Sequence, residues 1–471
     1  MDRAPGLPAL FAGQREAFAR EPYPSLAVRL DRLARLRTLL ERHGDHLAQA
    51  ISADFGNRSL HETAIAETFI VLAAIAHTRR HLKRWMKARR VPTSFHSLPG
   101  TSRILPQPVG VVGVVSPWNY PLQLALAPMV AALAAGNRVL VKPSELTPGF
   151  AGLLAELVSG AFAPDEAAVV LGDADVGKAF VAQPFDHLFF TGSTAVGRQV
   201  ALAAAAHLTP VTLELGGKSP ALVDTGADLQ EAAARIAAGK LFNAGQTCIA
   251  PDYVLLPRGQ EEAFARAYRQ AVLRMYPRLE ENPDYTSIVN ARHYQRLEGL
   301  VQDAQQRGAR VLPIAPEGES ADPARRKLRP AVLLEVAPDM AVMQEEIFGP
   351  LLPVLPYDRL DDAIAFVNAR PRPLALYWFG HDAARRQAVL TRTVSGGVTV
   401  NDVLLHIAQE NLPFGGAGES GIGAYHGEHG FRLFSKEKPV FIQSRLAGNA
   451  LLRPPYGPAT ERVLRLLRKL V

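Results

Sequence analysis

The chain has 471 residues, 48% of them hydrophobic and 21% charged, so it can bury two or three sizeable cores and has the composition of an ordinary globular protein. Its single cysteine excludes an intrachain disulfide framework and a thiolate-rich metal site, and it fits a reducing cytoplasm. The net charge of +7 comes from basic residues scattered over helical segments, which is typical of solvated helix faces, so we expect no nucleic-acid partner.

The sequence shows no signal for export, membrane insertion or metal binding. The N-terminal MDRAPGLPAL contains an acid and a base and no uninterrupted apolar core, so we expect no secretory signal. The alanine-rich runs at 127–135 and 201–206 are too short to span a bilayer, and no integral membrane segment is expected. The histidines are dispersed without the spacing of metal ligands, so we expect no metal.

The first part of the chain is predicted to contain helices and then an extended segment. Leucines recur at spacings of three and four from Leu26 to Leu36, with arginine and glutamate on the opposite face. We interpret 14–90 as helical throughout, and these helices need a larger body on which to pack. From Thr101 to Pro108 the pattern is extended, alternates with polar residues and ends in prolines.

Alternating strands and helices follow. Strands are predicted at 109–115, 138–142, 168–172, 187–191 and 211–215. Helices are predicted between them at 121–135, 148–160 and 194–206, with a short helix after Asp175. Five strands joined by four helices predict an α/β fold with a doubly wound parallel sheet. In such sheets, ligands bind beyond the carboxyl ends of the strands.

A second α/β domain is predicted after Gly217, where the alternation is looser. Its strands are expected near 220–224, 252–256, 330–335, 351–357, 374–379 and 397–401. The charged, proline-bearing segment 317–329 is interpreted as a surface loop. The tail ends in ERVLRLLRKLV, a basic amphipathic helix. We favour its docking on the parent fold or on a second subunit over attachment to a membrane surface, because so short a helix offers little apolar area.

The only cysteine, Cys248, follows a helix-like run and lies in the small-residue turn NAGQTC. Gly245 allows close backbone approach, and Pro251 prevents regular structure from resuming at once. By itself, a lone cysteine leaves packing and catalysis both open. A nucleophilic thiol would need donors for a developing oxyanion, an acceptor for the group that leaves and a base for later hydrolysis. A free thiol is mostly protonated at neutral pH, so the site is also expected to favour ionisation.

Two of these partners have candidates at strand ends. Asn119, in SPWNYP, follows the first strand of the sheet, and its amide can donate to an oxyanion. The alternative is a turn asparagine that stabilises its own backbone. Glu214, in LELGGK, ends the fifth strand. A carboxylate at an apolar strand end is costly unless it is protonated, paired or functional, so we expect a raised pKa and a role as general base.

The third partner, an acceptor, is indicated by FFTGSTAVG. Here a strand runs into Gly192, Ser193 and Gly197 as a helix opens, and the free N–H groups of a helix N-terminus bind pyrophosphate. The spacing is not the G-x-G-x-x-G fingerprint, so the motif alone is a weak signal. Lys142 and Glu145, in KPSE, follow the second strand, where ribose hydroxyls would lie; a surface ion pair is the alternative.

A further candidate for the dinucleotide site is EEIFGP, which carries Glu346 and Phe348. These two residues either cap a nicotinamide riboside or close a loop. No other catalytic apparatus competes, because the sequence contains no G-x-x-x-x-G-K-[ST], no H-E-x-x-H and no G-x-S-x-G.

Seven motifs occur in a characteristic order: SPWNYP, KPSE, FTGSTAVG, LELGGKSP, NAGQTC, EEIFGP and LPFGGAGESGIGAYHG. Together they resemble the aldehyde dehydrogenase superfamily along nearly the entire chain. Three further segments, TCIAPDYVL, ARPRPLALYWFG and GAYHGEHGFRLFSK, are similar to its class 3 and coniferyl aldehyde dehydrogenase branch. The resemblance implies a cytoplasmic homodimer in which a small bridging sheet of each subunit extends a sheet of its partner.

The resemblance also implies a division of the subunit into an NAD(P)-binding domain, a catalytic domain, a bridging β element and a tail. The corresponding residues are 1–98 with 109–213, 214–425, 99–108 with 428–444, and 445–471.

Roles for single residues follow from the same resemblance. Cys248 would be the nucleophile and Glu214 the base, and the Asn119 amide with the Cys248 backbone N–H would form the oxyanion hole. NAD or NADP would be held by Lys142, Glu145, Gly192, Ser193, Gly197, Glu346 and Phe348. The substrate tunnel would be lined by Tyr120, His406 and Phe414.

The implied activity is NAD(P)-dependent oxidation of an aldehyde to a carboxylic acid through a cysteine thiohemiacetal and thioester. The expected substrate is an aromatic aldehyde such as coniferyl aldehyde, or a medium-chain apolar one. A CoA-acylating semialdehyde dehydrogenase is one alternative, and a retired enzyme that serves as a binding or structural dimer is another. An oxidase of phosphate-sugar aldehydes is disfavoured, because no extra basic cluster accompanies the tunnel motifs.

Overall fold

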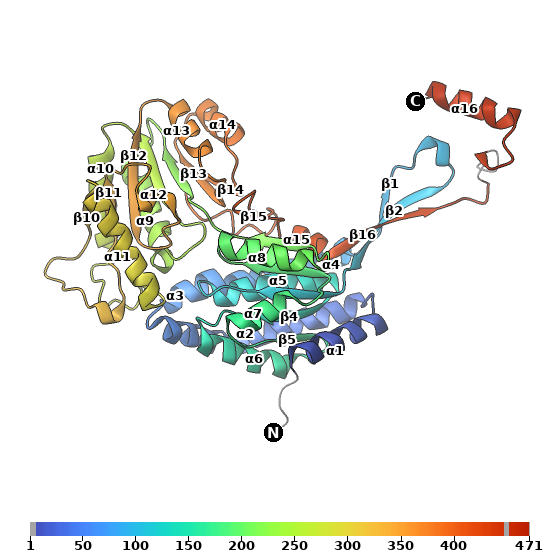
Figure 1. Cartoon of the computed structure of the whole chain (residues 1–471), viewed down its shortest axis with the longest axis horizontal. Coiled ribbons are helices and arrows are strands. Elements are labelled where there is room, and N and C mark those ends of the chain that lie inside the picture. Colours follow the sequence, from blue (N-terminus) through green and yellow to red (C-terminus); the bar gives the residue numbers. More distant parts are fainter. Residues whose placement is uncertain (1–5, 447–451, 471) are drawn as a thin grey trace.

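Two large sheets and a projecting three-stranded arm make up the molecule (Figure 1). The structure is a computed structural model that describes residues 6–446 and 452–470. The first sheet has the strand order β15-β7-β6-β3-β4-β5, and only β15 runs antiparallel to its neighbour. Its strands are β3 (Val111–Val115), β4 (Arg138–Lys142), β5 (Ala167–Val169), β6 (His187–Thr191), β7 (Val211–Glu214) and β15 (Gly421–Ile422).

Four helices connect the parallel strands of this sheet. They are α5 (Pro121–Ala135), α6 (Pro148–Ala161), α7 (Ala174–Val181) and α8 (Thr194–Ala205). From β3 the chain moves outward through β4 and β5, then crosses back and continues on the other side through β6 and β7. The strand order therefore reverses beside β3, and this switch point is where a doubly wound sheet binds ligands. The predicted α/β fold with a doubly wound parallel sheet is confirmed.

The second sheet has the order β10-β11-β12-β9-β8-β13-β14 and is parallel except at β10. Its strands are β8 (Pro220–Val223), β9 (Tyr253–Pro257), β10 (Arg310–Pro313), β11 (Ala331–Leu334), β12 (Leu351–Tyr357), β13 (Ala375–Phe379) and β14 (Gly397–Val400). Its helices are α9 (Leu229–Leu241), α10 (Glu261–Met275), α11 (Ala291–Gln306), α12 (Ala341–Gln344), α13 (Leu360–Asn368) and α14 (Ala383–Arg392). Strand β10, which was not predicted, is short and only partly buried, so it lacks an apolar run.

The third sheet forms the arm and is antiparallel in the order β1-β2-β16. Its strands are β1 (Arg89–Val91), β2 (Thr101–Pro108) and β16 (Ser435–Ile442). Figure 1 shows the arm projecting from the body of the molecule. The strand on the C-terminal side begins at Ser435 and not at 428, because Gly427–Leu433 forms the helix α15.

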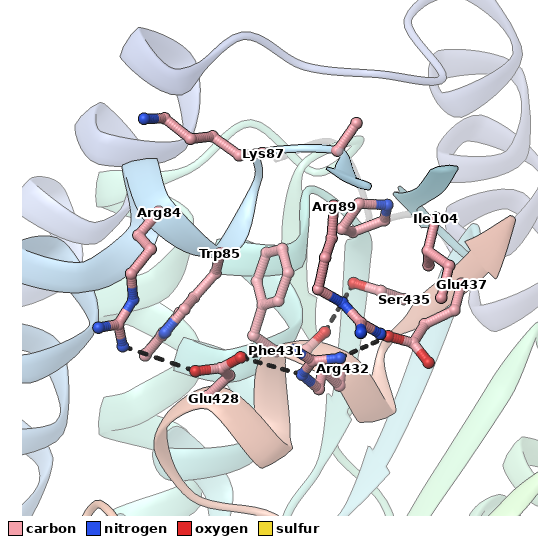
Figure 2. Close-up of a pocket in the computed structure, with 12 residues that line it drawn as sticks. Arg84, Trp85, Lys87, Arg89, Ile104, Glu428, Phe431, Arg432, Ser435 and Glu437 are labelled. Carbon is pink, nitrogen blue, oxygen red and sulfur yellow. Dashed lines mark hydrogen bonds and ion pairs between the residues drawn. The ribbon is translucent and has the colours of Figure 1, made fainter. Parts of the chain in front are cut away.

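Ion pairs brace the root of the arm (Figure 2). Glu428 on α15 pairs with Arg84 at 3.6 Å and with Arg432 at 2.7 Å, and Arg432 also pairs with Glu437 on β16. A cavity of about 360 Å³ lies beside them over Trp85 and Phe431. None of its lining residues belongs to the candidate site described below.

The N-terminal helices are separate and do not form one helical region over 14–90. They are α1 (Leu7–Arg20), α2 (Leu26–Phe55), α3 (Leu60–Thr63), the π-helical turn η1 (Ala64–Thr68) and α4 (Phe69–Trp85). Pro22 and Pro24 separate the first two, and Gly56, with φ of 80°, ends the second in a left-handed cap. The prediction of helix throughout was therefore wrong, and residues 89–91 belong to a strand.

By length and composition, the run Leu60–Trp85 is able to cross a membrane, with a mean hydropathy of 1.2. The expectation that no stretch of the chain reaches the length needed to span a bilayer is therefore wrong for this run. A single helix of this kind is weak support for a membrane span, because core helices pass the same test. Helix α4 packs against α2 and α5, which accounts for part of its apolar character.

The C-terminal helix α16 (Pro458–Leu470) lies beyond the tip of the arm and apart from the two large sheets (Figure 1). Docking on its own subunit's body, one of the expected arrangements, is therefore not what the structure shows. Leu464 and Leu466 are largely exposed there.

Candidate active site

Three side chains from distant parts of the chain meet beyond the carboxyl end of the first sheet. Glu214 is the last residue of β7, Asn119 follows β3, and Cys248 follows α9 and the short helix η3 (Phe242–Gly245). The Cys248 Sγ atom lies 3.6 Å from Glu214 Oε1. The Asn119 side-chain amide donates to the carbonyl of Gln246, two residues before the cysteine, at 3.2 Å. An amide nitrogen carries two hydrogens, so one donor of Asn119 is left for a ligand.

A cavity of about 220 Å³ opens onto this cluster. Asn119 and Cys248 line it, and so do four residues predicted to hold a dinucleotide: Gly192, Ser193, Glu346 and Phe348. Candidate catalytic residues and candidate dinucleotide-binding residues therefore line the same cavity. Cys248 packs against the core on one side and lines the cavity on the other, so it is accessible to a ligand in that space.

The turn before Cys248 has a backbone that few sequences tolerate. Asn243 and Ala244 adopt left-handed φ values of 53° and 50°, which are unfavourable for residues with a β-carbon. At Gly245, with φ of 76°, a β-carbon would lie 2.3 Å from the carbonyl oxygen of Gly349. The turn is held from outside, because Glu62 Oε2 accepts the Asn243 N–H at 2.9 Å. Strain of this kind is typical of functional sites.

Burial sets the protonation of the two reactive groups. It raises the pKa of Glu214 to about 7, which agrees with the raised value expected for this carboxyl. Burial, reinforced by the Glu214 and Glu346 carboxylates, raises the pKa of the Cys248 thiol well above its usual range. The expectation that the site favours thiolate is thus wrong for this conformation. The thiol is protonated and donates to Glu214, a proton acceptor in direct contact.

Glu346 places a carboxyl group in the cavity wall. The residue is partly buried, and the loss of solvent around its carboxyl raises the pKa to about 8. Its Oε1 atom has no hydrogen-bond partner among the residues that the structure describes. A β-carbon at Gly216 would lie 2.4 Å from this carboxyl group, so only glycine fits opposite it. An unpaired buried oxygen is costly, and a ligand hydroxyl would satisfy it. These observations fit the ribose of a dinucleotide.

Three aromatic and basic residues of the cavity were not singled out from sequence: Trp118, His293 and Arg296. The Trp118 ring lies 5.2 Å from His293 and 5.5 Å from Phe348. Arg296 donates to the carbonyls of Glu346 and Ile347 and so holds the EEIFGP loop. Trp118 lies inside the quoted motif SPWNYP, but nothing in the sequence marked His293 or Arg296, which come from α11.

The remaining dinucleotide candidates lie outside this cavity. Lys142, at the end of β4, forms an ion pair with Glu145 at 3.7 Å, as the alternative reading of KPSE anticipated. Gly197 packs against Leu215, where a β-carbon would lie 2.6 Å from a methyl group. Its place in the structure is therefore the contact between α8 and the segment after β7.

The three tunnel candidates are buried but do not line the same cavity. The Tyr120 hydroxyl bonds to the hydroxyl of Thr247, next to the cysteine, at 2.6 Å. The rings of His406 and Phe414 lie 5.9 Å apart, and His406 bonds to Thr399 at 2.8 Å. Tyr120 thus reaches the nucleophile loop directly, whereas the other two form an aromatic contact of their own.

Residues 10–440 match the family model described as the aldehyde dehydrogenase family. The chain belongs to the aldehyde dehydrogenase family. The resemblance drawn from the seven motifs is confirmed, and the chain is an NAD(P)-dependent aldehyde dehydrogenase.

Two bacterial relatives cover almost the whole of this aldehyde dehydrogenase. A probable coniferyl aldehyde dehydrogenase of Pseudomonas aeruginosa is 51% identical over 97% of this chain and 95% of its own length. A coniferyl aldehyde dehydrogenase of a Pseudomonas species is 49% identical over 94% of this chain and 92% of its own length. The assignment to the coniferyl aldehyde dehydrogenase branch is thus supported along nearly the whole chain.

Solved structures agree with this fold. The substrate-bound state of Staphylococcus aureus AldH superimposes with a TM-score of 0.92 and 36% identity, covering 98% of this chain and 100% of that one. An NAD+ complex of a Bacillus cereus aldehyde dehydrogenase gives a TM-score of 0.83 and 28% identity, covering 93% of this chain and 89% of that one. NAD or NADP is therefore the cofactor class of this aldehyde dehydrogenase.

Proposed function

We propose that this aldehyde dehydrogenase oxidises aromatic aldehydes, coniferyl aldehyde foremost, to their carboxylic acids, with Cys248 as nucleophile. The observation that carries the proposal is the meeting of the Cys248 sulfur, the Glu214 carboxyl and the Asn119 amide beside one cavity. The aromatic preference is supported by the two Pseudomonas relatives, which are identical to this chain at about half of the aligned positions.

The proposed chemistry starts with loss of the thiol proton to Glu214, which the short contact allows. The sulfur attacks the aldehyde carbon, and the resulting oxyanion of the thiohemiacetal is stabilised by the Asn119 amide and the Cys248 backbone N–H. NAD or NADP, when bound, supplies the acceptor for the hydride that leaves. Once Glu214 has released the thiol proton to solvent, its carboxylate deprotonates the water that hydrolyses the thioester. The acid product forms, and the departing thiolate takes a proton back from Glu214, so the thiol is restored.

Glu346, Phe348 and Ser193 would hold the dinucleotide, because they line the cavity next to Cys248. Ser193 caps the N-terminus of α8 through the N–H of Val196, and the free N–H groups of that turn suit a pyrophosphate. Lys142 and Glu145 remain proposed for the ribose farther along the sheet edge.

A cytoplasmic homodimer is also part of the proposal. The strand β16 is an edge strand of the arm, and its last residues, Phe441 and Ile442, are about half exposed. An exposed apolar edge strand favours pairing with another chain. The mass of the particle by light scattering tests this, and a monomer at micromolar concentration would contradict it.

An aldehyde panel tests the substrate class. Coniferyl aldehyde, benzaldehyde and hexanal are each assayed with NAD and with NADP, in the absence of CoA, by absorbance of the reduced dinucleotide. The proposal expects kcat/KM for coniferyl aldehyde to exceed that for hexanal at least about tenfold. A preference for hexanal contradicts the aromatic class. Turnover only with CoA would indicate the acylating alternative, and no turnover with any aldehyde would indicate the retired enzyme.

Replacing Asn119 with alanine should lower kcat by about 10² to 10³ because one oxyanion donor is lost. Steady-state kinetics with saturating dinucleotide measures this. Asn137 is an equally buried amide that bonds to Gly110 and Phe434 away from the cavity, so Asn137→Ala is the matched control for stability. Near-normal turnover of Asn119→Ala would remove Asn119 from the mechanism.

The rate of thioester hydrolysis should rise with pH through about 7 and level off above it. Glu214 acts as a base only when deprotonated, and burial raises its pKa to about 7. Below that pH the deprotonated fraction falls roughly tenfold per unit. Stopped-flow measurement of acyl-enzyme decay from about two pH units below this pKa to about two units above it checks this. A profile without this limb would mean that Glu214 is not the base.

A further inference from the structure

Arg58 and Glu67 form an ion pair at 3.0 Å in which neither side chain has any exposed surface. Taking two charges out of water is expensive, so a buried pair usually adds little net stability over apolar residues of the same size. Glu62 is a second buried acid of this segment, and all three side chains bind backbone groups of the segments that carry Asn119 and Cys248. Because the desolvation of the Arg58–Glu67 pair is unfavourable, stability alone does not explain an arginine at this position.

The contacts of Arg58 lead directly to Asn119. Its Nη1 atom donates to the backbone carbonyl of Asn119 at 2.8 Å. Its guanidinium carbon lies 4.8 Å from the centre of the Tyr120 ring. The Tyr120 hydroxyl in turn bonds to Thr247, the residue before Cys248. One side chain therefore holds the segment that carries the amide and, through Tyr120, the loop that carries the thiol.

The two acids complete the support. Glu67 Oε2 accepts the N–H groups of Leu122 and Gln123, at 2.7 Å and 3.0 Å, where α5 begins just after Asn119. Glu62 Oε2 accepts the N–H of Asn243 in the strained turn. Residues 58–67 thus bind the backbone of both segments whose side chains must meet, and they do so without touching the cavity.

We propose that Arg58 is a positioning residue of the aldehyde dehydrogenase reaction, which fixes the Asn119–Tyr120 peptide so that the Asn119 amide faces the oxyanion formed on Cys248. The inference rests on the proposed role of Asn119. Misplacement of a catalytic group by about 1 Å can cost on the order of 10²-fold in rate, so a side chain that sets this peptide affects catalysis without contacting the substrate.

Arg29, on α2, offers a matched control. It is as buried as Arg58 and donates to the carbonyls of Ala134 and Ala135, at the far end of α5. Its guanidinium lies 5.0 Å from the ring centre of Tyr23, as that of Arg58 lies over Tyr120. Loss of either arginine removes a buried charge bound to carbonyls, but only Arg58 is connected to Asn119.

The test compares Arg58→Met and Arg29→Met in the full-length enzyme. The rate constant of the first burst of reduced dinucleotide is measured by stopped flow, with active sites counted by the burst amplitude and dinucleotide affinity measured by fluorescence. We expect Arg58→Met to slow the burst about tenfold or more, with dinucleotide affinity within about twofold of the parent. Arg29→Met should keep its burst rate within about twofold, even if its melting temperature falls. An unchanged burst in Arg58→Met, or equal slowing in both variants, overturns the proposal.

A double-mutant cycle with Asn119→Ala shows whether Arg58 acts through Asn119. In that background Arg58→Met should change the rate by less than about threefold, since the amide it positions is gone. If the rate loss of the double variant equals the product of the two single losses, the two residues act independently and the proposal is overturned. Arg58→Lys keeps a positive charge and a hydrogen-bond donor, so its burst rate should lie between those of the parent and Arg58→Met. If Arg58→Met does not fold, Arg58→Lys is measured in its place. If Asn119→Ala alone turns over normally, the proposed role of Asn119 has failed and Arg58 is left as a structural residue.

Discussion

Replacing Cys248 with serine is expected to abolish aldehyde oxidation, with a loss on the order of 10³-fold or more in kcat. Serine keeps the size and the hydrogen bond to Glu214, but its alcohol is a far weaker nucleophile than a thiol at neutral pH. Reduced dinucleotide is followed spectrophotometrically with coniferyl aldehyde. Because the substitution leaves Glu346 and Phe348 untouched, dinucleotide affinity should change by less than about twofold.

Thr247→Ser is the neighbouring control for this experiment. It retains a hydroxyl beside Tyr120 and leaves the sulfur in place, so loop disturbance is separated from loss of the nucleophile. Turnover by Cys248→Ser at more than a few per cent of the parent rate would show that another group attacks the aldehyde. Since Cys248 is the only cysteine in the chain, no second thiol can substitute for it.

Glu214→Gln is expected to give one burst of reduced dinucleotide, close to one per active site, and then almost no turnover. The amide can still accept a hydrogen bond but cannot take a proton from water, so the thioester persists. We expect the steady-state rate to fall by about 10² or more, with the burst itself slowed less. The loss of the thiol's proton acceptor should make the burst slower at low pH than in the parent.

Glu346→Gln separates this effect from a general change of charge. Glu346 lines the cavity and also has a raised pKa, but it is proposed to bind ribose. Its replacement should raise KM for the dinucleotide without the stall after one turnover. Full steady-state activity of Glu214→Gln would mean that another group serves as base.

Hydrophobic periodicity was enough to predict most of the fold. The strands β4, β6 and β12 have the predicted bounds, because each is an apolar run buried on both faces. Strand β15 has only two residues within a glycine-rich segment and no apolar run at all. Leucine spacing predicts helix on both sides of Pro22 and Pro24 but carries no information about the break between them, which the prolines impose.

The residues of the candidate site could be predicted from sequence where the residue type and its position next to a strand or helix indicate a chemical role. A single cysteine, an acid at a strand end and a glycine turn before a helix are such signals. Arg58, Glu62 and Arg296 were missed because their role depends on contacts across 49 or more residues of sequence. The raised pKa of the thiol was missed for a related reason. Residue type predicts that a nucleophile is present, but only burial and the nearby carboxylates determine its protonation.

Mass spectrometry of the acyl-enzyme tests the central claim most directly. The Glu214→Gln enzyme is mixed with coniferyl aldehyde and dinucleotide, quenched in acid after the burst, digested, and the peptide that contains Cys248 is analysed. The account predicts a stoichiometric thioester of the corresponding acid on Cys248. An unmodified Cys248 peptide after a full burst of reduced dinucleotide, or an acyl group on any other residue, would contradict it.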